Sequence, residues 1–109
     1  MEWPGKPRAL VAARREEAGR LAAVLSGYAR RFAHDLHEAR RAAQGHEWTV
    51  IVVEARFRGR GELLEWLREG SGAPVVEIDL RAFPYDHRGY RVMRRSLDAL
   101  VERASASRS

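Results

Sequence analysis

The segment spanning residues 48–81 constrains the fold most strongly, because its apolar periodicity changes from strand to helix and back within a short length of chain. Alternating residues predict strands over 48–57 and over the run VVEIDL at 75–80, and residues 61–69 between them have a helical pattern. Two strands joined through one helix and short loops form a parallel βαβ crossover. We therefore expect an α/β protein.

The preceding residues, 8–44, are rich in Ala, Arg and Glu and are expected to be helical. Apolar residues recur in steps of three or four from Leu21 to Ala43, which indicates one apolar stripe. One helix over this range would be about 55 Å long. The segment is therefore either a single long helix or a helical hairpin that breaks near Gly19 or Gly27, and the unbroken stripe favours the single helix.

A last amphipathic helix is expected after the sequence AFPYDHRG. Its apolar positions are Tyr90, Met93, Leu97, Leu100 and Ala104. The 109 residues are expected to form a single domain. Its parts are a helical segment at 8–44, a βαβα unit at 48–104 and a frayed tail at 105–109.

Only two strands are predicted, and two parallel strands leave unpaired edges on both sides. A second copy, another protein or a strand hidden in a loop or helix would complete such a sheet, and the long apolar stripe favours a homodimer. The chain has no cysteine, no apolar run of transmembrane length and no apolar signal-peptide core near its start. We therefore expect a cytoplasmic protein without a membrane segment.

Basic residues outnumber acidic ones by twenty to fifteen, and every basic residue except Lys6 is arginine. Two clusters are candidate anion-binding groups: the turn with Arg56, Arg58, Gly59, Arg60 and Gly61, and the helix with Arg88, Arg91, Arg94 and Arg95. A glycine-rich turn that opens a helix presents free N–H groups and a favourable dipole to an anion. The clusters predict binding of a phosphate-rich ligand or nucleic acid, unless the arginines are simply solvated.

The spacing Arg-x-x-Gly-x-Gly from Arg56 to Gly61 resembles the acyl-CoA pyrophosphate loop of the GNAT acetyltransferases. This resemblance implies that the N–H groups from Arg58 to Gly61 would hold a pyrophosphate. That family has several antiparallel strands before the loop, whereas a helix is expected here. An acyl-CoA-dependent acetyltransferase is therefore an alternative function.

A longer resemblance covers residues 50–101, whose order of strand, helix, strand and helix is similar to the STAS domain of anti-sigma-factor antagonists. It is carried by Asp79-Leu80 at a strand end and by Asp86, Gly89 and Tyr90 at a helix start. The resemblance implies a protein-binding switch or scaffold. His87 stands where the regulatory serine is expected, so serine phosphorylation is not implied.

The sequence predicts no catalytic residue, metal site or cofactor. His34 and His37, with Asp35 and Glu38, are expected on a solvated helix surface among arginines. Arg81, opposite Glu54 or Asp79, is expected to form a cross-sheet ion pair with one of these carboxylates.

The favoured function is therefore a non-catalytic regulatory or scaffolding module that acts through protein–protein contacts. An enzyme is disfavoured. Polyanion binding through the arginine clusters is the second hypothesis. The residues expected to contact a protein partner are Tyr28, Phe32, Leu36, Asp86 and His87.

Overall fold

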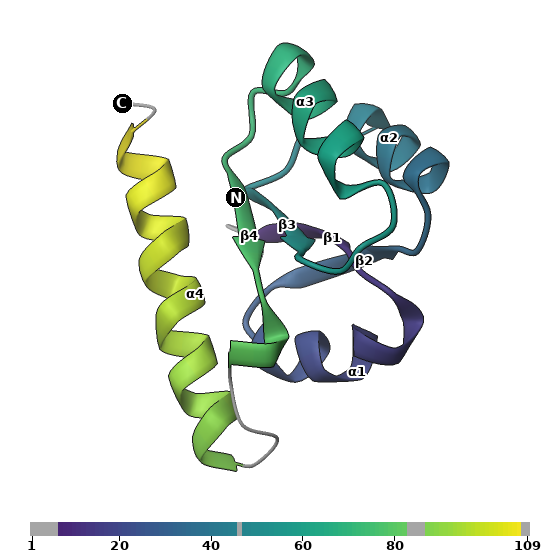
Figure 1. Ribbon diagram of the computed structural model, residues 1–109. Coiled ribbons are helices and arrows are strands. Elements are labelled where there is room, and N and C mark those ends of the chain that lie inside the picture. Colours follow the sequence, from purple (N-terminus) through teal and green to yellow (C-terminus); the bar gives the residue numbers. More distant parts are fainter. Residues whose placement is uncertain (1–6, 46, 83–86, 108–109) are drawn as a thin grey trace.

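The computed structural model describes residues 7–45, 47–82 and 87–107. Strands and helices alternate along these ranges, as Figure 1 shows. The elements are β1 (Arg8–Ala12), α1 (Arg15–Val24), β2 (Ala29–Ala33), α2 (Leu36–Gly45), β3 (Val50–Glu54), α3 (Arg60–Gly70), β4 (Val75–Ile78), the short 3-10 helix η1 (Leu80–Ala82) and α4 (His87–Ser107).

The strands form one parallel sheet in the order β2-β1-β3-β4. β1 is central, since Leu10 pairs with Arg31 on one side and with Ile51 on the other. Nearly every residue of β1 and β3 is buried, because helices cover both faces of the sheet. This is the usual environment of a parallel sheet.

Each face of the sheet has its own apolar core. On one face, Leu21 of α1 and Met93 and Leu97 of α4 pack on inward residues such as Val11 and Val52. On the other face, α2 and α3 supply the small residues Ala39 and Ala42 and the larger Leu63 and Leu67. The helices α1 and α4 therefore lie on one side of the sheet, and α2 and α3 lie on the other.

The long helix or helical hairpin expected over residues 8–44 is wrong. This range contains β1, α1, β2 and α2, and the longest dimension of the molecule is 38 Å. The residues from Ala9 to Ala12 are buried on both faces, so they show no alternation that would reveal a strand. The apolar stripe runs through α1 as far as Leu25, but its continuation at Tyr28 and Phe32 belongs to the turn and to β2.

The expected βαβ unit is confirmed by β3, α3 and β4, and the last helix is confirmed by α4. The expected strands are shorter in the structure: β3 ends at Glu54, and Leu80 belongs to η1. α4 continues to Ser107, inside the tail expected over 105–109, and fraying of that tail stays a prediction.

The additional strands β1 and β2 complete a sheet of four strands within one chain. The homodimer was inferred from a sheet of only two strands and from a continuous helical stripe, whereas the described residues form four strands and divide the stripe among α1, β2 and α2. Dimerisation therefore stays a prediction that has lost these two supports. Within the described ranges, no helix is both long enough and apolar enough to cross a membrane.

Candidate functional site

The strand order reverses between β1 and β3, and this reversal locates the candidate site. From β1 the chain goes outward to β2, then crosses back so that β3 lies on the other side of β1. In doubly wound α/β folds, including flavodoxin-like ones with the order 2-1-3-4-5, ligands bind beyond the carboxyl ends of the strands at such a reversal. Here the positions at these ends include Arg14, which follows β1, and Glu54, the last residue of β3.

Glu54 is buried, with 1% of its surface exposed. Arg14 donates its Nε–H to Oε1 of Glu54 over 3.1 Å, and the backbone N–H of Arg56 donates to Oε2 over 2.8 Å. A buried carboxylate needs such partners, because its loss of hydration is otherwise costly. These bonds join the loop after β1 to the end of β3.

Arg14 contacts a second carboxylate as well. Its Nη2 lies 3.1 Å from Oε1 of Glu17, which is 7% exposed. The hydrogen bond to Glu54 raises the pKa of Arg14 above its ordinary value, and the charges of nearby glutamates add to this rise. Arg14 thus stays charged and holds Glu17 and Glu54 together.

The start of α1 explains why Arg14 and Glu17 meet. Arg14 is the N-cap residue, with an extended backbone at φ −67° and ψ 150°. Glu16 and Glu17 occupy the first turn of α1, where the helix dipole favours negative charge. Residues three positions apart are neighbours on a helix, which brings Glu17 close to Arg14.

Arg20 ties α1 to the segment that follows β4. It is 5% exposed, and its Nη1–H donates to the carbonyl oxygen of Leu80 over 2.9 Å. Two arginines from the first part of the chain therefore hold the ends of β3 and β4. We call Arg14, Glu17, Arg20 and Glu54 the switch-point network.

The network is extended at its exposed margin by an ion pair between Asp79 and Arg81. The guanidinium of Arg81 donates to both carboxylate oxygens of Asp79, at 3.0 and 3.1 Å. These hydrogen bonds lower the pKa of Asp79 below its ordinary value. The expected ion pair of Arg81 with Asp79 is confirmed, but the two residues are two positions apart in one segment, so the pair does not cross the sheet.

The turn with Arg56, Arg58, Gly59, Arg60 and Gly61 does open a helix, as expected. Gly59 is the N-cap of α3 and has a left-handed backbone with φ 87°, which glycine adopts without steric cost. Arg60 forms an ion pair with Glu77 of β4 at 3.3 Å, while the side chains of Arg56 and Arg58 are exposed. One of the three arginines proposed for anion binding thus already has an acidic partner. The sheet before this turn is parallel throughout its described strands, unlike the antiparallel strands of an acetyltransferase.

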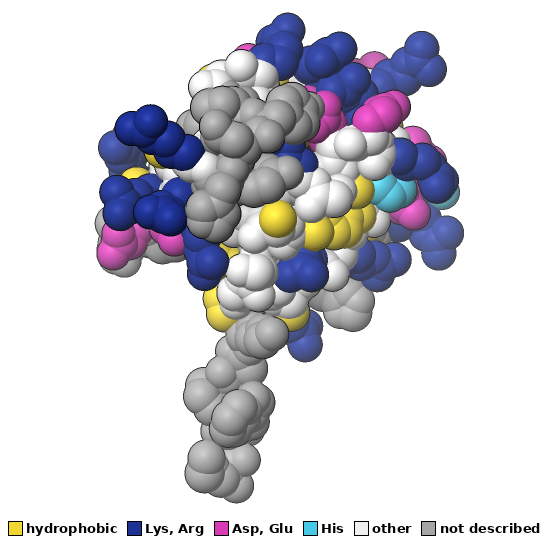
Figure 2. Space-filling view, turned by 90° about the horizontal axis from the view of Figure 1, so that it is seen from below, with side chains coloured by type: hydrophobic (Ala, Val, Ile, Leu, Met, Phe, Trp, Pro, Cys, Tyr) yellow, Lys and Arg dark blue, Asp and Glu magenta, His cyan; other side chains and the backbone are white. Residues whose placement is uncertain are grey.

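The second cluster, which comprises Arg88, Arg91, Arg94 and Arg95, lies in the first half of α4, and all four residues are exposed. Arg94 donates to the hydroxyl of Ser26 over 3.1 Å. The two clusters do not converge, because α3 and α4 cover opposite faces of the sheet. Figure 2 shows arginines in separate groups around one face of the molecule, with acidic side chains beside several of them.

The residues expected to contact a partner do not form one surface. Tyr28 and Phe32 are partly buried against the core on the α1 and α4 side, whereas Leu36 packs into the core on the α2 and α3 side. Asp86 lies outside the described residues, and His87 is the first residue of α4. The expected stripe is therefore divided between two cores.

The four residues considered for a metal do not lie together on a helix surface. His34 precedes α2, and its Nδ1 lies 3.0 Å from the carbonyl oxygen of Ala13. Asp35 and Glu38 cap α2: the Glu38 N–H donates to Asp35 Oδ1, and the His34 N–H donates to Glu38 Oε1, both over 2.7 Å. His37 is exposed on α2. In the part of the chain that the structure describes, no group of three or more potential metal ligands is present.

Sequence reasoning considered Glu54 but missed Arg14, Glu17 and Arg20, the other residues of the switch-point network. All three fall inside the range assigned to the long helix. The signal that could have found them is the run ALVAA at residues 9–13, followed directly by Arg14. A short apolar run that ends in charged residues is typical of a buried parallel strand and its carboxyl end.

The fold and the network define the chain as a doubly wound α/β domain whose switch point carries a buried charge network. Comparison with protein-family models gives no match. No curated protein and no solved structure matches the chain either.

Proposed function

We propose that this protein is a non-catalytic regulatory or scaffolding module that acts through protein–protein contacts. The observation that carries the proposal is the switch-point network, in which Glu54 is buried and both its oxygens accept hydrogen bonds. The likeness of residues 50–101 to STAS domains supports the same class of function.

The network argues against chemistry at the usual ligand position of this fold class. A general acid or base must come within hydrogen-bond reach of its substrate. The Glu54 carboxylate instead faces Arg14 and the backbone of Arg56, and its exposure of 1% leaves little access for a ligand. Interaction through the outer surface of the domain fits this arrangement better than catalysis.

The proposal is tested by two measurements on the whole chain. Photo-crosslinking in cells, followed by purification, should yield a partner that forms a complex of fixed stoichiometry with the purified protein. Thermal unfolding with nucleotides, acetyl-CoA or Mg²⁺ should show no ligand-dependent rise in melting temperature. A rise that disappears in Glu54→Gln would contradict the proposal, and so would the absence of any partner.

Binding of a phosphate-rich ligand or nucleic acid is the second candidate function. The observation that favours it is the exposure of Arg88, Arg91, Arg94 and Arg95 on one helix. Affinity for an oligonucleotide should then fall steeply with salt, because each phosphate contact releases bound counterions. Salt-independent affinity, or no loss on neutralising Arg91 and Arg95, would exclude this candidate.

A further inference from the structure

The open edge of β2 differs from the rest of the sheet. The N–H of Ala29 donates to Pro7, and the carbonyl of Ala33 accepts from Ala13, so these residues direct their backbone groups toward β1. In a parallel ladder such residues alternate with ones that face away. The backbone N–H and C=O groups of Arg30 and Phe32 therefore point to the open edge. A β-strand edge of this kind can pair with another chain.

The opposite edge of the sheet is less accessible. Figure 1 shows α4 running alongside β4, and Met93 and Leu97 of α4 belong to the same core as Val76 and Ile78 of β4. Ala29, Arg30 and Arg31 of β2 are exposed instead. Of the two edges, β2 is the one open for an additional strand.

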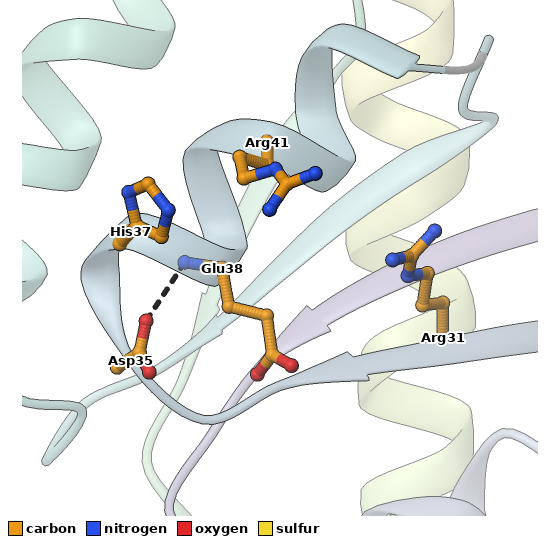
Figure 3. A pocket seen from close by; sticks show the side chains of 5 residues that line it. All are labelled: Arg31, Asp35, His37, Glu38 and Arg41. Atoms are coloured by element: carbon orange, nitrogen blue, oxygen red, sulfur yellow. Dashed lines mark hydrogen bonds between the residues drawn. The ribbon is translucent and has the colours of Figure 1, made fainter.

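Two hollows lie beside β2, and both are lined by Arg31. The larger has a volume of about 440 Å³ and is shown in Figure 3; it is lined by Arg31, Asp35, His37, Glu38 and Arg41. The smaller has a volume of about 210 Å³ and is lined by Arg8, Ala29, Arg30, Arg31 and Trp48. We call β2 and these two hollows the β2 groove.

The β2 groove has a positive charge balance. Its lining contains four arginines and two acidic residues, if histidine is counted as neutral. Both acids have a structural task, because Asp35 and Glu38 cap α2. The side chains of Arg8, Arg31 and Arg41 are exposed, and none has a hydrogen-bonding or ion-pairing partner among the described residues. In Figure 3, Arg31 and Arg41 extend toward each other from β2 and α2.

We propose that the β2 groove binds an extended acidic segment of a partner protein by strand addition. The backbone of the segment pairs with Arg30 and Phe32, its carboxylates contact Arg8, Arg31 and Arg41, and its apolar residues pack beside Trp48. Backbone pairing combined with pockets for alternate side chains is an established mode of peptide recognition. This inference rests on the proposed protein-interaction function and adds the chemical class of the partner.

A second copy of the chain fits the groove poorly. Pairing β2 with β2 of another molecule would bring Arg30 and Arg31 next to the same arginines of the copy. Like charges directly opposite each other destabilise a strand pair. Complementary charge therefore selects an acidic segment over self-association at this edge.

The test uses the whole protein and an array of octapeptides that alternate Asp or Glu with an apolar residue, with affinity measured by fluorescence anisotropy. The double variant Arg31→Ala/Arg41→Ala should weaken the tightest peptide at least about tenfold, since hydrogen bonds between charged groups are the strong ones. The matched double variant Arg15→Ala/Arg68→Ala, which removes two exposed arginines elsewhere, should leave the affinity unchanged.

Strand addition itself is tested on the peptide, so that the fold of the protein is not at risk. Two versions of the tightest peptide are made, one methylated on the odd-numbered and one on the even-numbered backbone nitrogens. Binding should be abolished in the version whose methyl groups replace the N–H groups that pair with β2, and it should persist in the other. Equal binding by both methylated peptides, or no binding by any peptide, would overturn the inference. Tighter binding of a single-stranded oligonucleotide to the same arginines would also overturn it. If cellular crosslinking still finds a partner in these cases, the proposed function stands and only the β2 groove is excluded.

Discussion

The arginines at the carboxyl ends of the strands and those beside β2 differ in their surroundings. Arg14 and Arg20 are mostly buried or bonded to acceptors from other elements, and they hold the sheet ends together. The side chains of Arg8, Arg31 and Arg41 are exposed, and none of them has a hydrogen-bonding or ion-pairing partner among the described residues. The comparison teaches that arginines of one chain can be held in the fold or left exposed, and that of these two groups only the second is accessible to another molecule.

The largest expected effect tests whether the switch-point network is structural. Glu54→Ala removes a buried carboxylate that accepts hydrogen bonds from Arg14 and Arg56, so it should lower the free energy of unfolding by about 2–3 kcal/mol. Urea denaturation measures this loss. Arg31→Ala should change stability by less than about 0.5 kcal/mol, as expected for an exposed residue. Equal losses in both variants would remove the distinction between the two groups.

The next largest expected effect is a loss of stability on substituting Gly59, in the turn between β3 and α3. Gly59→Ala should destabilise the protein by about 1 kcal/mol or more, because a left-handed backbone disfavours a Cβ atom. That atom would also lie 3.4 Å from Cβ of Leu36. Gly61→Ala is the matched control, since an added Cβ there meets no atom within 4 Å and α3 favours alanine. Thermal unfolding should separate the two variants, and a Gly59→Ala protein as stable as Gly61→Ala would disprove the strain.

The smallest expected effect is on the pH dependence of stability, and it comes from the exposed ion pair between Asp79 and Arg81. Arg81 lowers the pKa of Asp79 in the folded state, so the pair stabilises the fold above the unfolded pKa of aspartate, about 3.9. This contribution is lost as the pH falls through the lower folded pKa. Wild type and Asp79→Asn should therefore differ slightly in stability at pH 7 and converge in strong acid. Urea denaturation across this pH range checks the prediction, and a constant difference would contradict it.

The second half of the fold could be predicted from the sequence. The strand with Val50 and Val52 lies between clear turn signals, and glycines mark both ends of α3. The run VVEIDL alternates because Val76 and Ile78 face a core while Glu77 faces solvent. β3 is buried on both faces, but its β-branched residues lie between turn signals, and β4 and α3 show the periods of a strand and a helix.

The first half could not be predicted in the same way. β1 is buried on both faces, so Leu10 and Val11 look no different from residues of a buried helix. β2 has exposed arginines at its start and offers little apolar alternation. Only part of the candidate site could therefore be predicted. Glu54 ends a recognisable strand, whereas Arg14 follows a strand that resembles a helix in sequence.

The central position of β1 has a consequence for synthesis. β1 is made before the other strands of the sheet, yet one of its two neighbours, β3, follows only after α1, β2 and α2. Until β3 is made, one edge of β1 is unpaired although the strand is apolar on both faces. Partly synthesised chains with such an edge are prone to aggregate. Nascent chains should therefore become resistant to protease only once their exposed length includes Val50–Glu54, and chaperone binding is expected to be strongest just before that point.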